Sequence, residues 1–590
     1  MDLSYQVTGK NNKAPFTLKI HRGDCMVLLA MNWKNGKPPK DFVGFAIEYQ
    51  PPKGDRYFPV KNRIGFPGQR MKPSDPSIES TRAPFQKFRW VHFGRDPLQE
   101  GKFRYRVTPM FMGRDKVLSS GESQEAALEL MRETIPDKLN VAFTRGFVSS
   151  QAFVDRFEPG GKITTLIPGE AAQGLGFKPT HKQAEKAYEW MGLEARAAIH
   201  DVLDRAIADK AEVRVIAYDL NLPEIVSRLE QIGTRLKIII DDSSGQNGGH
   251  KSPDSQESIA AKRLMKSAGA TNVVRQHMVK LQHQKSIVVS GKNINAVVYG
   301  STNFSWRGFY VQSNNAIVVT DKGAVETHLK AFNTYFNAKK ADDFKKSASA
   351  NGWKSLGVKG LDAKVGYSPH SANNGLLKSI GEDIDDAESS VFFSLAFLGQ
   401  TKKGPIGPAL GRAIKNKKVF TLGIADARVQ EGNLGVTVLT ADEKSRVVRS
   451  SALTGNVPAP FKTEPSGLSG EDGTGRGTRM HHKFIVIDFN TNNARVYTGS
   501  YNFSEPADTD NGENLLLIKD RTVATSYMIE ALRMYDHYLY RSAQEAAKSK
   551  GKGKNVLELQ YPPTKPTDKP WWQKDWDDPI RRRDRELFSE

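Results

Sequence analysis

A chain of 590 residues is too long for a single hydrophobic core, and three domains would be an ordinary number at this length. With 38% apolar and 26% charged residues, it has the composition of a soluble globular protein. Its formal net charge of +20 predicts a polyanionic partner, either nucleic acid or an anionic phospholipid surface.

Targeting segments and cysteine frameworks are missing from the sequence. Nowhere do about 18 apolar residues follow one another, so no transmembrane helix is predicted. Residues 1–16 lack the basic end and the apolar stretch of a secretory signal. The single cysteine, Cys25, rules out an intramolecular disulfide framework and cannot form a cysteine-based zinc site alone. We expect a cytoplasmic protein, with a secreted effector that lacks a conventional signal as the alternative.

Residues 1–122 are predicted to form an antiparallel β-sandwich of the immunoglobulin or fibronectin kind. Apolar and polar residues alternate in residues 42–50 and 101–111, and the breaks between such runs are rich in Gly, Pro, Asn and Lys. Trp90 and His92 are expected in the core and at the edge of the sandwich, with contact to a ligand as the alternative. Because it contains no catalytic constellation, this domain is predicted to be a binding or interaction module, with a protein as a candidate partner.

Residues 123–345 are predicted to form a first α/β unit, which opens with a connecting helix at residues 123–135. The elements expected next are a helix at 194–210, a strand at 212–220, a helix at 223–233, a strand at 235–242 and a helix at 259–269. Helices alternating with short apolar strands predict a largely parallel sheet with helices on its faces.

Residues 346–545 are predicted to form a second α/β unit of the same kind. Its expected elements are strands at 363–369, 389–397 and 419–425 and helices at 375–387 and 406–417. The irregular segment 455–477 is rich in Gly and Pro, and we expect it to gate the site or contact the substrate. The charged tail, residues 546–590, carries three tryptophans that either bind nucleic acid with nearby basic residues or dock on the body of the protein.

A pair of short motifs occurs twice in the chain, in residues 281–305 and 478–504. Each copy has a histidine and a lysine two residues apart, an apolar stretch, and then Gly-Ser-x-Asn-Phe-Ser. The matching residues are His283 and His481, Lys285 and Lys483, Gly300 and Gly499, Ser301 and Ser500, and Asn303 and Asn502. Such an internal repeat indicates two related structural units.

The repeated residues suit phosphoryl transfer. A histidine and a lysine two residues apart on an extended strand project to the same side and face one ligand. Lysine supplies a point charge for phosphate oxygens, asparagine supplies neutral hydrogen bonds, and glycine permits close approach of the backbone. Two copies facing each other would supply a nucleophile, an acid and cationic clamps without a metal or another cofactor. The residues expected to bind substrate beside the catalytic groups are Gly300, Ser301, Gly499 and Ser500.

The repeat resembles the signature of the phospholipase D superfamily, H-x-K-x4-D followed by G-S-x-N, over roughly residues 140–545. The resemblance implies two α/β/α sandwich units about a pseudo-twofold axis, with the active site at their seam. It also implies a covalent phosphohistidine intermediate and no metal. The second copy is complete and includes Asp488, whereas Ser290 stands at the equivalent position of the first copy. Family aspartates at this position mostly support the local structure.

A second asymmetry follows the Gly-Ser-x-Asn turns, where Asn314 and Glu513 occupy equivalent positions. In the family, such an amide or carboxylate typically holds the histidine ring of its own motif. Because a carboxylate raises the pKa of its histidine, His481 held by Glu513 is predicted to be the general acid. His283 held by Asn314 is then the predicted nucleophile, and the reverse assignment is the alternative. Tyrosyl-DNA phosphodiesterases show a comparable split of amide and carboxylate.

The motif does not identify the phosphodiester. The positive charge and the cations near the first motif favour a nuclease on DNA or RNA; these cations are Lys266, Arg275, His277 and Lys280. A phospholipase D acting on phospholipid headgroups is the alternative, and a nucleic-acid or protein binding scaffold is a third interpretation. A metal site at His250 with Asp241 and Asp242 is rejected because no further ligands occur at a recognisable spacing. The oligomeric state is not determined by the sequence.

Overall fold

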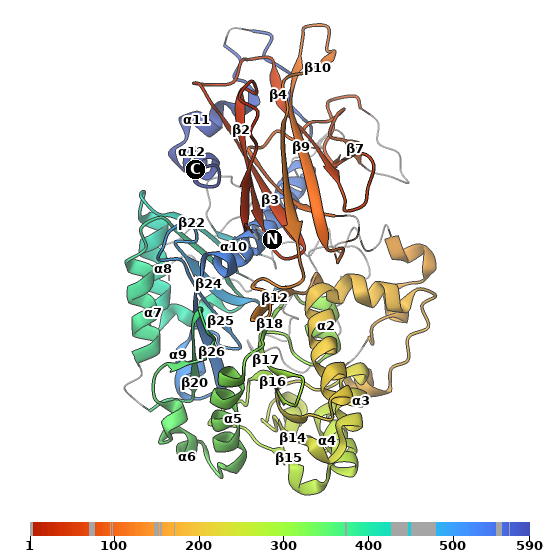
Figure 1. Ribbon diagram of the computed structural model, residues 1–590, viewed down its shortest axis with the longest axis vertical. Helices are drawn as coiled ribbons and strands as arrows, with labels where there is room; N and C mark the ends of the chain where they lie inside the picture. The colour runs from red at the N-terminus through yellow and green to blue at the C-terminus, as the bar shows by residue number, and fades with distance from the viewer. Residues whose placement is uncertain are drawn as a thin grey trace. The chain divides into compact units, whose positions relative to one another are not determined.

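A computed structural model describes residues 4–69, 77–94, 96, 98–146, 153, 156–169, 171–371, 375–425, 447–449, 480–549, 557–565 and 567–590. The chain divides into two compact units (Figure 1). The terminal unit comprises Met1–Arg132 and Tyr540–Glu590, and the central unit comprises Glu133–Leu539. The segment 455–477, for which a gating role is predicted, lies outside the described residues. Among the described helices, none combines the length and apolarity needed to cross a membrane.

The terminal unit contains two antiparallel sheets. The first has the strand order β1 (Gln6–Thr8), β2 (Phe16–Arg22), β3 (Met26–Trp33), β8 (Arg89–Phe93). The second has the order β10 (Leu118–Ser120), β9 (Gly101–Met112), β4 (Phe42–Gln50), β5 (Phe58–Pro59), and β11 (Gln124–Leu130) also pairs with β9. The strands β6 (Lys61–Asn62) and β7 (Ile78–Glu79) form a separate antiparallel pair. Apolar side chains from strands of both sheets share one buried cluster, as the alternating sequence pattern predicts.

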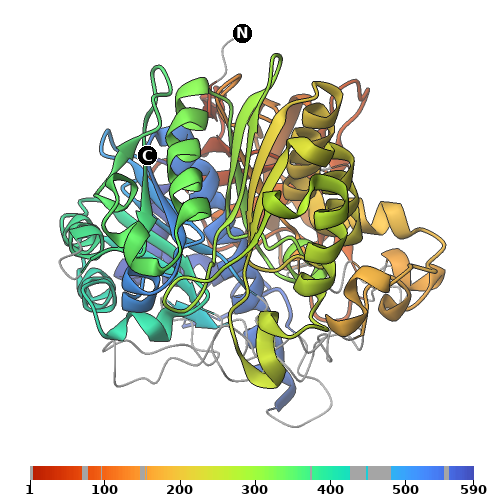
Figure 2. The ribbon, with the colours of Figure 1, turned by 90° about the horizontal axis from the view of Figure 1, so that it is seen from below.

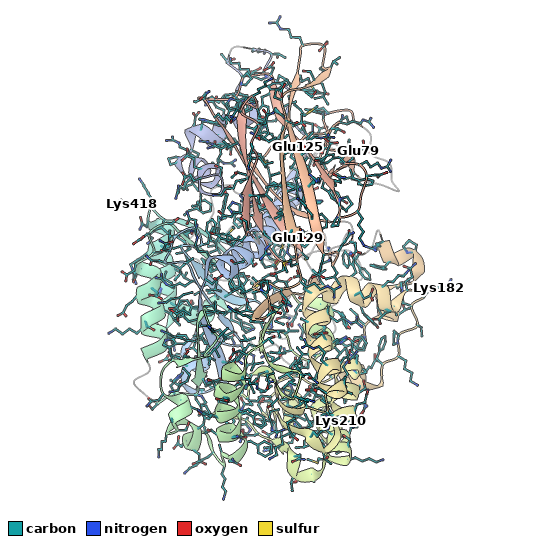
Figure 3. The ribbon with its side chains drawn as sticks, in the orientation of Figure 1. Glu79, Glu125, Glu129, Lys182, Lys210 and Lys418 are labelled. Atoms are coloured by element: carbon teal, nitrogen blue, oxygen red, sulfur yellow. The ribbon has the colours of Figure 1, made fainter. Side chains whose placement is uncertain are left out.

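Strand β11 replaces the connecting helix predicted at residues 123–135. Leu128 and Leu130 face the core, while Glu125 and Glu129, labelled in Figure 3, occupy alternate positions on the other face. Ala, Leu and Glu favour helices, but pairing with β9 along seven residues overrides this propensity. The predicted domain boundary at residue 122 is therefore wrong, because the sheet continues to Leu130.

His92 and Trp90 lie on the edge strand β8 of the first sheet, as predicted. His92 is buried, its Nδ1 lies 3.1 Å from the Tyr105 hydroxyl, and burial lowers its pKa to about 3. The Trp90 ring contacts Phe85 with centroids 3.9 Å apart. His92 is therefore part of the interior, and Trp90 is partly buried against the core cluster.

The end of the chain folds onto this sandwich. Its helices are α11 (Lys574–Asp577) and α12 (Pro579–Leu587), which follow the end of α10 (Arg521–Ser549). The indole nitrogens of Trp571, Trp572 and Trp576 donate to the carbonyls of Phe42, Pro39 and Gly36 at 3.0, 3.2 and 3.2 Å. Trp572 belongs to the sandwich core. Of the two interpretations of the tail, the structure supports docking on the body.

The central unit contains two mixed sheets that share one order over seven strands, and the second sheet has an additional edge strand, β19. The first is β12 (Leu139–Phe143), β18 (Asn315–Val319), β17 (Asn295–Gly300), β16 (Lys285–Ser290), β13 (Glu212–Ala217), β14 (Leu236–Ile240), β15 (Val273–Arg275). The second is β19 (Lys354–Ser355), β20 (Asp362–Ser368), β26 (Glu513–Lys519), β25 (Arg495–Gly499), β24 (Lys483–Ile487), β21 (Ser390–Leu395), β22 (Phe420–Ala425), β23 (Val447–Arg449).

The prediction of a largely parallel sheet is wrong for both. In the first sheet only the pairs β13–β14 and β14–β15 are parallel, and in the second only β21–β22 and β22–β23. The strands of each repeated motif instead pair antiparallel, β16 with β17 and β24 with β25. The four residues between β16 and β17 are too few for the crossover that a parallel pair requires.

Helices flank these sheets (Figures 1 and 2). Those following the first sheet's strands are α2 (Ala184–Ala208), α3 (Pro223–Ile232), α4 (Gln256–Ala268), α5 (Lys322–Asn337) and α6 (Ala341–Lys345). Those of the second are α7 (Gly375–Asp385), α8 (Ile406–Lys415) and α9 (Glu505–Thr509), with the start of α10. In Figure 2 the strands lie between α2, α3 and α4 on one side and α7 and α8 on the other. The α/β class predicted from the sequence is confirmed.

Candidate active site

The two repeated motifs meet through exchanged backbone contacts. Gln282, just before the first motif, forms a β-bridge with Gly512, which precedes β26 of the second sheet. Met480, just before the second motif, forms a β-bridge with Ser313 in the turn before β18 of the first sheet. His283 donates its backbone N–H to the Gly512 carbonyl at 2.9 Å, and His481 donates to the Ser313 carbonyl at the same distance. The predicted residues of both copies are thus brought to one place.

The side chains of the two histidines are held across this junction. His283 Nδ1 lies 2.8 and 2.9 Å from the two carboxylate oxygens of Glu513. His481 Nδ1 lies 2.8 Å from Asn314 Oδ1. The prediction that Glu513 holds His481 and Asn314 holds His283 is therefore wrong, because each turn reaches the histidine of the opposite motif.

The surroundings of Asn314 fix the tautomer of His481. The amide Nδ2 of Asn314 donates to the Gly308 carbonyl at 3.0 Å, so its Oδ1 faces the imidazole as an acceptor. His481 must therefore carry its proton on Nδ1. Glu513, which can only accept when ionised, imposes the same tautomer on His283. Each neutral ring accordingly has its lone pair on Nε2.

The two lysines lie beside their own histidines and against aromatic rings. Lys285 Nζ donates to the His283 carbonyl at 2.5 Å and lies 4.8 Å from the centroid of Tyr218. Lys483 Nζ lies 2.9 Å from His481 Nε2 and 5.4 Å from the centroid of Phe397. Contact with an aromatic face stabilises an ammonium group without neutralising it.

The Gly-Ser pairs after each motif strand lock the turn to the next strand. Gly300 and Gly499 have φ angles of +135° and +149°, and a Cβ atom at either would lie 2.3 or 2.4 Å from a backbone carbonyl oxygen. Ser301 and Ser500 are fully buried, and their Oγ atoms accept from backbone N–H groups of the next strand at 3.1 and 3.0 Å. These contacts explain why glycine and serine are required here, and contact of the four residues with substrate stays a prediction.

Asn303 and Asn502 follow these serines and lie buried beside the motifs. Each has an Oδ1 atom with no hydrogen-bond partner among the described residues. An unpaired buried polar atom costs about 1–3 kcal/mol. Rotation of either amide by 180° places its NH₂ group at that position, where it can donate to an added ligand.

His482, between the two motif residues of the second copy, has a different environment. Its side chain is buried, and burial together with the nearby Arg533 guanidinium holds its pKa well below 6.5. Because side chains alternate along a strand, it faces away from His481 and Lys483. We therefore assign His482 to the interior.

Asp488 is hydrogen-bonded to the backbone at the start of β21. Its carboxylate accepts the backbone N–H groups of Glu388, Ser389 and Ser390 at the start of β21, at 2.7 to 3.1 Å. The first sheet, with Ser290 at the equivalent position, uses a different carboxylate. Asp209, which precedes β13, accepts from the backbone N–H and the side chain of Asn293 in the β16–β17 turn.

The four cations near the first motif have individual partners. Arg275 donates to the carbonyls of Asp241 and His250, His277 Nδ1 lies 2.7 Å from Asp242 Oδ1, and Lys280 forms an ion pair with Asp510 at 2.8 Å. Lys266 is exposed near the end of α4. Only Lys280 contributes to the junction, since Asp510 precedes the Gly512 bridge.

His250 lies in a buried charged cluster that contacts the site. Its ring lies 4.7 Å from that of Tyr218, which in turn lies 4.8 Å from that of His283. Burial lowers the pKa of His250, but the carboxylates of Glu257, Asp219 and Asp241 outweigh burial and hold the pKa well above 6.5. The fold thus supplies companions for His250 that the sequence spacing did not reveal.

Comparison with known proteins agrees with the paired motifs. The family described as "Cardiolipin synthase, PLD-like domain" matches residues 203–337 and 431–535. Over these residues the central unit is similar to the phospholipase D-like family.

Individual relatives match shorter stretches of the chain. A phospholipase D from Rickettsia prowazekii is 48% identical over 48 residues, which are 8% of this chain and 22% of that protein. A mitochondrial cardiolipin hydrolase from Xenopus tropicalis is 39% identical over 59 residues, 10% of this chain and 26% of that protein. The chain thus spans about a quarter or less of the length of these curated relatives. A phosphatidylserine synthase structure from Haemophilus influenzae is 13% identical, with a TM-score of 0.40 over 59% of this chain and 85% of that chain.

The central unit also contains residues that its motifs do not predict. The rings of Tyr218 and Phe397 lie against Lys285 and Lys483, respectively. Tyr218 lies one residue after the strand partner of its lysine, whereas Phe397 lies two residues after the partner of its own. An overlay of the two repeats therefore does not align them. Asp209 lies 81 residues before Ser290 and could be recognised only from the folded turn.

Proposed function

We propose that this protein is a phosphodiesterase that acts through a covalent phosphohistidine. The observation that carries the proposal is the exchanged pair of hydrogen bonds, His283 to Glu513 and His481 to Asn314. This exchange makes one site from two motifs and presents both Nε2 lone pairs. Two oriented imidazoles beside two lysines are the groups that a double displacement at phosphorus requires.

The reaction proceeds in two steps with balanced proton transfer. In the first, His283 Nε2 attacks phosphorus and forms a P–N bond, while the bond from phosphorus to the leaving oxygen breaks. For this step His481 must first take up a proton at Nε2, in place of its contact with Lys483, and it then gives that proton to the leaving oxygen. In the second, His481 accepts a proton from water, whose oxygen attacks phosphorus and breaks the P–N bond. The product phosphate monoester departs, and both histidines return to their starting states.

The observed partners require a new argument for these roles. Attack by His283 places a positive charge on its ring, and the Glu513 carboxylate stabilises that charge, as a carboxylate does for an imidazolium. Asn314 is neutral and does not hold a proton on His481, so His481 releases its proton more readily. The roles predicted from the sequence are retained, but the physical reason for them is reversed.

The remaining site residues act on the phosphoryl oxygens. Lys285 and Lys483 neutralise the charge that develops on these oxygens, and the amides of Asn303 and Asn502 donate hydrogen bonds to them. The unpaired Oδ1 atoms of both asparagines support this role. If each amide rotates, its NH₂ group takes that position and can donate a hydrogen bond to a bound phosphate.

The proposed substrate is a nucleic acid, and the net charge of +20 supports it. Phospholipid is the second candidate, because relatives of the central unit are named phospholipase D and cardiolipin hydrolase. We further propose that the two sheets of the central unit are phospholipase D-like units related by a pseudo-twofold axis. Their common strand order supports this interpretation. The terminal unit is proposed to be an interaction module of the immunoglobulin or fibronectin kind.

The substrate is tested with purified full-length protein in EDTA. Labelled single-stranded DNA, double-stranded DNA and RNA are incubated beside vesicles of phosphatidylcholine, phosphatidylglycerol or cardiolipin. We expect cleavage of nucleic acid that His283→Ala and His481→Ala both abolish. Headgroup release from vesicles with intact nucleic acid would replace the nuclease proposal with a phospholipase. No cleavage of any substrate would contradict the phosphodiesterase proposal.

The roles of the histidines are tested with a p-nitrophenyl phosphodiester, whose leaving group needs no proton. On this substrate we expect His481→Ala to perform the first step at close to the rate of the unmodified protein. It should then accumulate protein-bound phosphate on His283. His283→Ala should remain inactive on both kinds of substrate. The opposite pattern would exchange the two roles.

A further inference from the structure

The cluster around His250 has the composition and spacing of a metal site. His250 Nε2 lies 3.4 Å from Asp219 Oδ1 and 3.9 Å from Glu257 Oε2. One ligand atom from each of the three residues lies within 4.8 Å of the other two. Around a metal with bonds of about 2.1 Å, tetrahedral ligand atoms lie about 3.4 Å apart. The first distance fits this value, and the second requires a shift of about half an ångström.

Hydrogen bonds outside the cluster orient two of these side chains. His250 Nδ1 lies 2.8 Å from Asp241 Oδ2, and Glu257 Oε1 accepts the Leu220 N–H at 3.1 Å. Metal-binding histidines commonly donate their second nitrogen to a carboxylate in this manner. Asp241 also accepts the N–H of Ser243 and that of Gln282, which fixes the carboxylate itself. His250 is therefore held with Nε2 directed toward Asp219 and Glu257.

The position of His250 Nε2 points to a cation. The side chain is only 8% exposed, and both Nε2 distances exceed the 2.7–3.2 Å of an ordinary N–H···O hydrogen bond. With carboxylates on two sides of it, Nε2 carries either a proton or a metal ion. The guanidinium of Arg275 binds the backbone carbonyls of Asp241 and His250, so it offsets only part of the cluster's negative charge. A divalent ion between Nε2 and the two carboxylates would take the place of that proton.

We propose that Asp219, His250 and Glu257 bind one divalent ion of the Zn²⁺ or Mn²⁺ class, with water in the remaining positions. One imidazole and two carboxylates are donors that these ions accept. Asp219 is half-buried, so the site has a route to solvent. This site goes beyond the proposed function, in which the four motif residues act on phosphate without a metal. The ion instead fixes the segment that carries Tyr218 against His283.

The experiment uses the full-length protein after dialysis against EDTA and then against chelator-free buffer. ZnCl₂ and MnCl₂ are titrated by calorimetry, and Co²⁺ absorption reports the coordination. We expect one ion per chain and a higher melting temperature with metal. Loss of a residue that only hydrogen-bonds to a metal ligand weakens metal binding by roughly 10- to 100-fold. Because Glu257→Gln and His250→Gln remove a ligand itself, they should weaken binding at least as much.

His277→Gln is the matched control. It also removes an imidazole from a His–Asp pair, with Asp242, but that pair is 41% exposed at the histidine and lies outside the ligand set. Its affinity for metal should equal that of the unmodified protein. If His250→Gln fails to fold, metal binding is measured in Asp219→Asn instead, because this residue is half-buried. No saturable binding, or binding unchanged in the ligand variants, would overturn the site and leave His250 as an imidazolium among three carboxylates.

Discussion

Glu513 is the residue whose replacement best tests the exchanged arrangement. In Glu513→Gln, the amide NH₂ can face His283 Nδ1, which favours the tautomer with a proton on Nε2 and removes the attacking lone pair. We expect kcat/KM to fall by about 10²- to 10⁴-fold, the range over which a positioned acid or base contributes. Steady-state kinetics on the cleaved phosphodiester measure this loss.

Asn314→Asp provides the matched comparison on the other side of the junction. The carboxylate keeps an acceptor for His481 Nδ1 but holds the proton more firmly, so the loss should be smaller than that in Glu513→Gln. It should also be smaller on the p-nitrophenyl substrate, for which no proton transfer is needed. A larger loss in Asn314→Asp on both substrates would contradict the assignment of His481 as the acid.

The sequence was sufficient for the motif residues but not for their partners. The histidines, lysines and asparagines are identified by short spacings that recur. Asn314 and Glu513 follow their own motifs closely in sequence, yet their actual histidines lie 167 and 230 residues away. Such a choice is made by the packing of two sheets, which no local spacing records. The same holds for Asp219, His250 and Glu257.

At the level of elements, one carboxylate supports the second sheet. Asp488 is buried and accepts three backbone N–H groups at the start of β21. Asp488→Ala should lower the free energy of unfolding by about 2–3 kcal/mol, because hydrogen bonds to a charged group are lost and buried donors stay unpaired. Urea denaturation followed by circular dichroism measures the change.

Ser290→Ala is the corresponding change in the first sheet. It should alter the free energy of unfolding by no more than about 0.5 kcal/mol, because Asp209 supports that turn instead. Asp209→Ala should therefore be the more damaging of the two. Equal effects of Ser290→Ala and Asp488→Ala would show that the two turns are supported in the same way.

Strand β8 should make the terminal unit sensitive to acid. Burial lowers the pKa of His92 to about 3, whereas an unfolded histidine titrates near 6.5. Below pH 6.5 the unfolded chain therefore binds a proton that the folded chain does not. Stability from His92 is fully present above pH 6.5 and falls by up to about 1.4 kcal/mol per pH unit toward pH 3.

His92→Gln should remove this part of the pH dependence. The terminal unit contains five of the eight tryptophans, so their fluorescence during urea denaturation at several pH values reports mainly on this unit. Some slope should remain, because burial also lowers the pKa of His21 to about 4. An unchanged slope in the variant would show that His92 gains a proton without loss of stability.

Secondary structure was predictable where pattern and propensity agree. The helices α3 and α4 and the strands β13 and β14 could be predicted from the periodicity of their apolar residues. In these elements the apolar residues that form the pattern are also the ones that become buried. Residues 124–130 show the opposite case, because Ala, Leu and Glu favour a helix while β9 offers an unpaired edge. Whether that edge is free depends on residues far away in the chain.

At the scale of the whole molecule, the two ends of the chain form one core. Trp572 is 4% exposed and packs in the cluster built mainly from residues 14–130. Trp572→Ala should lower the stability of the terminal unit by about 3–5 kcal/mol. Lys569→Ala, at an exposed position of the same segment, should change it by no more than about 0.5 kcal/mol. Comparable effects of the two changes would contradict docking of the tail.

The shared core has a consequence for synthesis on the ribosome. After Arg132, another 424 residues must be made before residue 557 begins the segment that completes the sandwich. At about 5–20 residues per second, this takes about 20–85 s. During that time the apolar surface under Trp572 has no cover from its own chain, whereas the central unit emerges in full first. A chaperone that binds nascent chains would therefore find its target in the first 132 residues, and release would coincide with the arrival of the last tryptophans.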